Sequence, residues 1–580
     1  GETDVTVTLT ATASLKGETL SKTFDVFIPA ATVAGGDDVR KDAATLTLYP
    51  EYLTDIPAES LPTEGANGTT ITWKSSNPDV ISNDGKVTRP ALGKEAAMVT
   101  MMATVAKGDA TKDVFFDIKV WETVDTATNE GMVKETYYQT RATTYRKTTL
   151  NGYWDAWTAY AALGEDVANL NLIYDQSNIT ATQRGANILA LVELGYNPYN
   201  YDGKNYVKEL TDAGLGGTWS EPVFNVLGAD AAGIRANKPI SAVIDWTKNF
   251  GMGPDIGGWA AVVLAHHMGV DIAGTADAKV FVENVAENMT KGLSGEGTST
   301  AISKGCVVQG LTALYKAGYT GTEVSGVSGL NVITDTPWIN KDENFDAIPS
   351  IYNTVKGSFG GTSYTYELAL FMCDLYNVYY GDRNVSWLEC GVTKAKLDAQ
   401  VAKANAILAD EAEYDAASVK NIKAALDAVS AISEDRLNAK IADYGEEYYT
   451  LYDAVRYAKL AGQSEMDQAA ADKVADQINA LNDEITLADK DAVDAAKAAY
   501  DALTNDQKAL VAEDVVAKLT AAVDAIAGLE QAEVDKEAAA NVINEINKIN
   551  ENVTLDDQSA VAAARAAYDA LTKEQKALVT

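Results

Sequence analysis

The sequence contains two histidines, and they are adjacent. His266 and His267 lie in the stretch AVVLAHHMGV, residues 261–270. Histidine is the usual proton carrier near neutral pH and the commonest metal ligand, so chemistry is expected there first. Adjacent residues of a helix point about 100° apart, which predicts that the two rings cannot share one metal ion. We therefore expect no metal site, and we expect at most one imidazole to reach a functional site.

A second group of side chains could support a polysaccharide lyase. Such an enzyme needs a group that neutralises the substrate and a Tyr or His base. The catalytic candidates near the apolar segments are Arg184, Asn187, His266 and Tyr366, with Tyr364 beside them. The alternative is that these side chains fill a core. No spacing among them requires a catalytic arrangement, so the sequence favours a protein that is not an enzyme.

Aromatic side chains offer a non-catalytic alternative, because they can bind a sugar, a peptide or a planar cofactor. The candidates for such a surface are Trp154, Trp157, Trp219, Trp259 and Tyr364, with Tyr366 close by. Packing of helix against helix is the alternative role for them.

A separate contact patch is expected in TYYQTRATTYRKTT, residues 136–149. There Arg141 and Arg146 lie among tyrosines, and both residue types are frequent in interfaces. A solvated loop with one or two ion pairs is the alternative.

The composition limits the classes of function. A chain of 580 residues is too long for one core and should form several domains. Its net charge of -36 excludes a general nucleic-acid binder, which needs clustered Lys and Arg. Cys306, Cys373 and Cys390 are widely spaced and predict neither a disulfide framework nor a zinc site. No apolar run approaches the roughly 20 residues that span a bilayer, so we expect no membrane insertion in this chain.

Two segments near the N-terminus repeat at a spacing of 92 residues (99 − 7): VTLTATA at 7–13 and VTMMATV at 99–105. Their alternating β-branched residues predict β-sandwich domains. We expect residues 1–30 to be the C-terminal remnant of one such domain and 31–122 to be an intact one. The stretch ITWKSSNPDVISNDGKVTRP, from residue 71, resembles the bacterial Ig-like domains of Gram-positive surface and secreted proteins. The resemblance implies a spacer.

Residues 123–390 alternate apolar segments that end at glycine with more polar segments. Glycine after the last turn is the expected helix stop. This pattern predicts an all-α toroid, in which inner helices line a cavity. GGTWSEP (216–222) and KGSFGGTS (356–363) resemble the inner-helix entries of prenyltransferase and terpene-cyclase-like toroids, a group that includes corrinoid carriers. The cyclases' Asp-rich motif and the prenyltransferases' zinc ligands are absent, so their activities are not implied.

The chain after Cys390 has the Ala-, Glu- and Lys-rich composition of long amphipathic helices. AYDALTNDQKALV at 499–511 returns as AYDALTKEQKALV at 567–579, a spacing of 68 (567 − 499). Thr504 is predicted to cap a helix. The predicted buried stripe is Val493, Tyr500, Leu503 and Leu510.

These patterns predict α-helical bundle repeats at the C-terminal end of a multidomain chain. EYDAASVKNIKAALDAVSAI resembles the FIVAR modules of bacterial surface proteins, which implies a FIVAR-like module over 391–464. A helical repeat is expected over 465–532 and a partial copy over 533–580.

Together these resemblances imply an extracellular protein, bound to a bacterial cell surface or secreted. We expect it to be an adhesin whose toroid and adjacent helical module recognise a host protein, such as an immunoglobulin, or a glycoprotein. Two alternatives remain: a polysaccharide lyase in the toroid cavity, and a carrier of a corrinoid or another small molecule. The adhesin hypothesis requires no cofactor.

Overall fold

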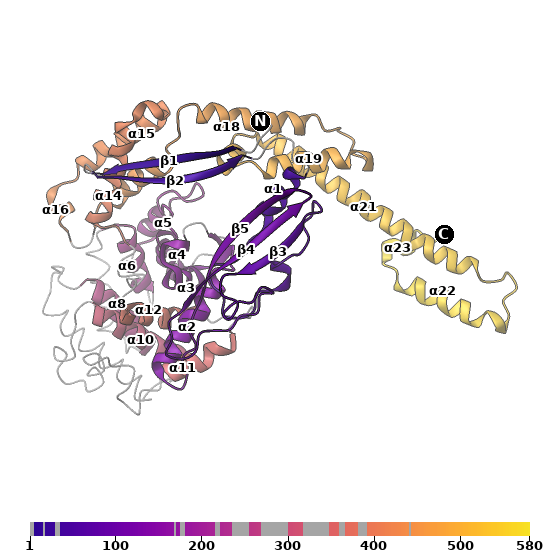
Figure 1. Ribbon diagram of the computed structural model, residues 1–580, viewed down its shortest axis with the longest axis horizontal. Helices are drawn as coiled ribbons and strands as arrows, with labels where there is room; N and C mark the ends of the chain where they lie inside the picture. The colour runs from indigo at the N-terminus through magenta and orange to yellow at the C-terminus, as the bar shows by residue number, and fades with distance from the viewer. Residues whose placement is uncertain are drawn as a thin grey trace. The chain divides into compact units, whose positions relative to one another are not determined.

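The computed structural model describes most of the chain (Figure 1). The described residues are 5–15, 18–28, 35–167, 170–173, 180–214, 221–234, 254–267, 300–316, 347–358, 366–380, 391–439 and 442–580. No helix among them is both long enough and apolar enough to cross a membrane.

The chain divides into two compact units. Unit 1 comprises Gly1–Gln400 and Ala428–Asp453, and unit 2 comprises Val401–Asp427 and Ala454–Thr580. Unit 1 therefore takes in short segments on the C-terminal side of residue 390, where the sequence predicts a separate module.

Unit 1 begins with strands. β1 (Val5–Leu15) pairs with β2 (Glu18–Ile28) in an antiparallel hairpin. A second antiparallel sheet has the order β3 (Thr70–Ser75), β4 (Ala97–Lys107), β5 (Ala110–Val120). The bounds of β1 and β2 each lie 92 residues before those of β4 and β5 (97 − 5 and 120 − 28). The sequence spacing of 92 is therefore also a spacing of strands with the same lengths.

A helix covers one face of the three-stranded sheet. In α1 (Gly36–Thr45), Val39 and Ala43 lie one turn apart and pack with Ala103 and Val105 of β4. Where the sequence predicts a two-sheet sandwich, the described part of 31–122 has one three-stranded sheet with a helix and loops packed on it. The i, i+4 spacing of Val39 and Ala43 is that of a helix, which accounts for α1.

Six helices follow, and we refer to them as the ring helices. Each contacts the next, and the last contacts the first, so that their contacts close a ring. They are α3 (Tyr153–Leu163), α4 (Ala181–Glu193), α6 (Glu221–Ala231), α8 (Pro254–His266), α10 (Ala301–Lys316) and α12 (Tyr366–Tyr380). Their buried side chains are mostly apolar and belong to one hydrophobic core.

Three further helices pack against the ring helices. α2 (Asn129–Thr144) contacts α3 and α12, α5 (Tyr206–Ala213) contacts α4, and α11 (Ala347–Val355) contacts α10 and α2. Two short strands lie on either side of α3 in the sequence: β6 (Thr149–Asn151) pairs in parallel with β7 (Asn171–Ile173).

Glycines let neighbouring ring helices approach closely. A Cβ on Gly258 of α8 would lie 2.0 Å from the carbonyl oxygen of Cys306 on α10. A Cβ on Gly228 of α6 would lie 2.4 Å from the carbonyl oxygen of Gly185 on α4.

Contacts at two levels show the direction of several ring helices. Phe224 and Asp230 of α6 contact Trp259 and His266 of α8 in the same order along the chain, so α6 and α8 run in the same direction. The contacts of α12 with α3 and α10 show the same order, which places the N-terminal ends of these helices on one side.

The remaining helices range from 4 residues in α16 to 35 residues in α21, and they are mostly polar on their surfaces. Those before residue 460 are α14 (Lys394–Ala409), α15 (Ala416–Ser430), α16 (Glu434–Leu437) and α17 (Gly445–Arg456). Those after it are α18 (Gln463–Asn479), α19 (Lys490–Asp501), α20 (Asn505–Ala509), α21 (Glu513–Asn547), α22 (Gln558–Ala570) and α23 (Lys573–Ala577).

In unit 2, the first half of α21 packs with α18 and α19 around an apolar core. Thr504 caps α20 with its side chain, as predicted. Val493 and Leu503 are buried and Tyr500 packs against the core, but Leu510 is exposed, so its place in the predicted stripe is wrong. Leu510 follows the short α20, outside the helix whose spacing defined the stripe.

Candidate functional site

Five aromatic rings meet near the N-terminal ends of three ring helices, and we refer to them as the aromatic cluster. They are Tyr153, Trp154 and Trp157 of α3, Phe224 of α6 and Trp259 of α8. The ring centres of Trp154 and Trp157 lie 5.0 Å apart, and those of Trp154 and Trp259 lie 5.7 Å apart. Phe224 lies 5.1 Å from Trp259. Such edge-to-face and tilted contacts between aromatic rings are favourable.

The aromatic cluster is buried on one side and partly accessible on the other. Trp157, Phe224 and Trp259 are buried, whereas Tyr153 and Trp154 are only partly buried. The indole Nε1–H of Trp157 is buried and has no acceptor among the described residues. A buried indole N–H usually has a hydrogen-bond partner, so this donor is suited to an oxygen from outside the chain.

Two carboxyl groups lie beside the aromatic cluster. Asp255 is in the first turn of α8 and Glu367 is in the first turn of α12. The thiol of Cys306 on α10 donates to Glu367 Oε1 at 3.9 Å. One oxygen of Asp255 is buried without a partner among the described residues. The helix ends thus bring together side chains that are more than 100 residues apart in sequence.

Glu367 has the properties of a proton donor. Burial, and then the charge of Asp255, raise the pKa of its carboxyl group to about 7. Burial and the charge of Glu367 also raise the pKa of the Tyr153 hydroxyl. A carboxyl group with a pKa near 7 can give or accept a proton at neutral pH, which is the property of a general acid or base.

The structure brings together three of the predicted aromatic binding residues: Trp154, Trp157 and Trp259. Trp219 and Tyr364 lie outside the described residues. Their predicted binding role stays a prediction, as does that of the three tryptophans.

The lyase candidates are spread over the ring helices. Arg184 and Asn187 lie in the first two turns of α4, and Asn187 is buried. Tyr366 begins α12, whereas His266 ends α8. Because the helices run in the same direction and α8 has 13 residues, about 20 Å separates its two ends. Tyr366 and His266 therefore do not meet.

Tyr366 lies in a charged environment. Lys147 Nζ lies 4.4 Å from its ring centre, and Thr158 Oγ1 donates to its carbonyl oxygen at 2.8 Å. Burial, and then the charge of Asp155, raise the pKa of its hydroxyl group. This shift opposes the phenolate form that a lyase base requires.

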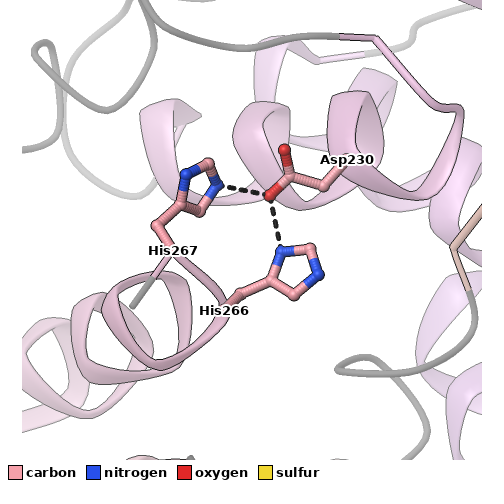
Figure 2. A group of neighbouring side chains, drawn as sticks. All are labelled: Asp230, His266 and His267. Atoms are coloured by element: carbon pink, nitrogen blue, oxygen red, sulfur yellow. Dashed lines mark hydrogen bonds and ion pairs between the residues drawn. The ribbon is translucent and has the colours of Figure 1, made fainter. Parts of the chain in front are cut away.

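The two histidines do converge, contrary to the expectation from their adjacency. Figure 2 shows both rings directed at one carboxylate oxygen, Oδ2 of Asp230 near the end of α6. His266 Nδ1 lies 2.8 Å from this oxygen and His267 Nε2 lies 2.6 Å from it. The expectation is wrong because one ring uses its near nitrogen and the other its far nitrogen. Nε2 lies farther from the backbone than Nδ1, so the two rings can contact the same oxygen although the two side chains leave the helix in different directions.

Asp230 is fully buried, and its charge depends on the histidines. Burial alone would raise the pKa of its carboxyl group, but the charges and hydrogen bonds of His267 and His266 outweigh burial and lower it. Asp230 is therefore a carboxylate that accepts a hydrogen bond from each ring. Its other oxygen, Oδ1, is buried and has no partner among the described residues.

Arg141 is not a surface residue, so its predicted place in a contact patch is wrong. Its side chain is 8 % exposed and pairs with Glu51, with Nη2 and Oε1 2.6 Å apart. It also donates to the carbonyl oxygen of Ala162. Arg146 is exposed and lies over the ring of Tyr52 at 5.4 Å, so it keeps its candidacy for contact.

Asp230 and Glu367 were not predicted from the sequence, because the side chains that interact with each of them lie on distant segments of the chain. A weak signal exists for both. Asp230 is the one charged residue in 222–231, and Glu367 precedes the apolar run from Leu368 to Cys373. An isolated charge on an apolar helix requires a partner when buried.

Comparison with known families identifies one region of the chain. A family described as an atrophied bacterial Ig domain matches residues 54–123. This match agrees with the single small sheet seen there and confirms the predicted bacterial Ig-like domain. No curated protein matches the chain. The region is therefore a bacterial Ig-like domain, and the part of the chain that follows it is mainly helical.

Proposed function

We propose that the chain belongs to an extracellular bacterial protein, secreted or bound to the cell surface, that binds the glycan of a host glycoprotein. The aromatic cluster at the N-terminal ends of the ring helices is the proposed binding site. The observation that carries the proposal is the accessible side of this cluster, Tyr153 and Trp154, backed by the unpartnered Nε1–H of Trp157. Aromatic faces pack on the apolar faces of sugars, and polar groups at their rim fix orientation.

Three further features support this assignment. The closed contacts of the ring helices support an α/α toroid, a fold whose inner-helix ends surround a cavity. The Ig-like domain at 54–123 supports a surface or secreted location, since such modules commonly act as spacers. The helices between residues 394 and 456 support the FIVAR-like module predicted over 391–464.

A glycan array probed with the full chain tests the proposal. We expect retention of a limited set of glycans, and we expect Trp154→Ala to lose that retention while Phe115→Ala keeps it. Phe115 is a matched control, because it is an exposed aromatic residue on β5 of the Ig-like domain. A wild-type chain that retains no glycan, or an equal loss in both variants, would contradict the proposal.

Glu367 favours a second candidate function, cleavage of a polysaccharide. A carboxyl group with a pKa of about 7 beside a second carboxyl group is the usual composition of a site for proton transfer to a leaving group. Incubation of each retained glycan with the chain, followed by mass spectrometry, separates the two functions. Cleavage that Glu367→Gln abolishes supports the enzyme, whereas intact glycan supports binding alone.

A further inference from the structure

We propose that Asp230, His266 and His267 bind a divalent transition-metal ion, with zinc as the best fit. This site lies at the C-terminal ends of α6 and α8, apart from the aromatic cluster, and the inference does not depend on the proposed function.

The geometry carries the inference. The oxygen of Asp230, Nδ1 of His266 and Nε2 of His267 all lie within 4.8 Å of one another (Figure 2). Zinc binds imidazole nitrogen and carboxylate oxygen at about 2.0–2.2 Å, so neighbouring ligand atoms in a tetrahedral site lie about 3.3 Å apart. The present separations of 2.8 and 2.6 Å between oxygen and nitrogen are shorter. An ion would therefore enter after the carboxylate retreats by about half an ångström.

The surroundings favour a cation. Asp230 is buried with one oxygen, Oδ1, that has no partner among the described residues. The site also lies at the C-terminal ends of two helices, where the helix dipole places a partial negative charge that stabilises a cation. A net charge of -36 for the chain acts in the same direction over longer distances.

The ligand set selects the metal. Two imidazoles and one carboxylate suit zinc and its neighbours in the first transition row, whereas calcium and magnesium prefer oxygen ligands alone. Three protein ligands leave a fourth position for water or a ligand. The His266 side chain is 20 % exposed and the His267 side chain 3 %, so access would be from the side of His266.

Histidine-selective NMR of the full chain tests the site directly, because the sequence has two histidines and both belong to it. The probe is zinc chloride, added to chelator-treated protein labelled with 15N in histidine. We expect both imidazole spectra to change and to saturate at one equivalent of zinc, with the shifts assigned to Nδ1 of His266 and Nε2 of His267. Calcium should leave the spectra unchanged. Unchanged spectra at several equivalents of zinc would overturn the proposal.

Calorimetric titration with zinc provides a second readout. We expect one site per chain with a dissociation constant on the order of micromolar or tighter. His267→Gln and Asp230→Asn should weaken it at least about tenfold. Asp483→Asn, which removes a surface carboxylate that is 96 % exposed, should leave it unchanged. Equal zinc affinity in wild type and His267→Gln would contradict the proposal, and circular dichroism checks that each variant is folded.

Discussion

Glu367 is a residue whose ionisation opposes folding. Its pKa rises from an ordinary value of about 4.3 to about 7 in the folded chain, because burial disfavours the charged form. The folded state therefore binds a proton more tightly than the unfolded state. Stability falls as the pH rises through this interval, and the loss is complete above about pH 7.

Glu367→Gln should remove this pH-dependent loss. Glutamine cannot ionise, so the variant should gain stability over wild type between pH 5 and pH 8, by at most on the order of 3 kcal/mol. Urea unfolding followed by tryptophan fluorescence measures the difference. All nine tryptophans of the sequence precede residue 400, so this signal reports on unit 1. A difference that does not change with pH would show that Glu367 is not desolvated in the folded chain.

Arg141 of α2 forms a buried ion pair with Glu51, whose backbone pairs with Lys119 of β5. Arg141→Met should cost about 3–5 kcal/mol, because it leaves the Glu51 carboxylate buried without its cation. Adding Glu51→Gln should recover much of that loss. Arg40→Met, which breaks an exposed ion pair, should cost about 0.5 kcal/mol or less. Equal losses for Arg141→Met and Arg40→Met in urea unfolding would contradict a buried pair.

At the scale of elements, close approach of the ring helices depends on glycine. Gly258 lies against the backbone of α10, so an added methyl group requires α8 and α10 to separate. Gly258→Ala should cost roughly 1–3 kcal/mol in unit 1 by overpacking. Gly528→Ala is the matched control, because Gly528 lies within α21 with open space around it. That change should stabilise α21 by about 0.5–1 kcal/mol. Gly258→Ala with wild-type stability would contradict close packing.

Several elements could be predicted from the sequence because their signals are local. Glycine stops and apolar runs predict the ring helices, and Thr504 with Gln507 predicts the start of α20 through a capping box. α1 was missed, since ten residues of helix lie within a segment whose other signals are those of strands. Leu510 was misplaced because a short helix ends just before it.

The sites could be predicted only in part. Trp154, Trp157 and Trp259 were selected as candidates because a large aromatic residue on an apolar segment either packs between helices or binds a ligand. Asp230 and Glu367 were not, because their partners lie on helices that the sequence does not pair. The convergence of His266 and His267 was not anticipated, because it depends on where Asp230 lies, which the packing of α6 on α8 determines.

At the scale of the whole molecule, the chain joins three kinds of structure. A small Ig-like domain precedes six helices whose contacts close a ring, and unit 2 adds further helices. The side chains best suited to a ligand lie at the N-terminal ends of the ring helices. The proposed metal site lies at the other ends, so each can be tested by changing residues that the other does not use.

The affinity of the full chain for the glycan best retained on the array tests the central claim most directly. Calorimetric titration should give saturable binding to the wild type, and Trp154→Ala should weaken it at least about tenfold, because an interface tryptophan often contributes more than 1.4 kcal/mol. Phe115→Ala should bind like the wild type. Binding of equal strength in all three proteins, or no saturable binding to the wild type, would contradict a glycan site in the aromatic cluster.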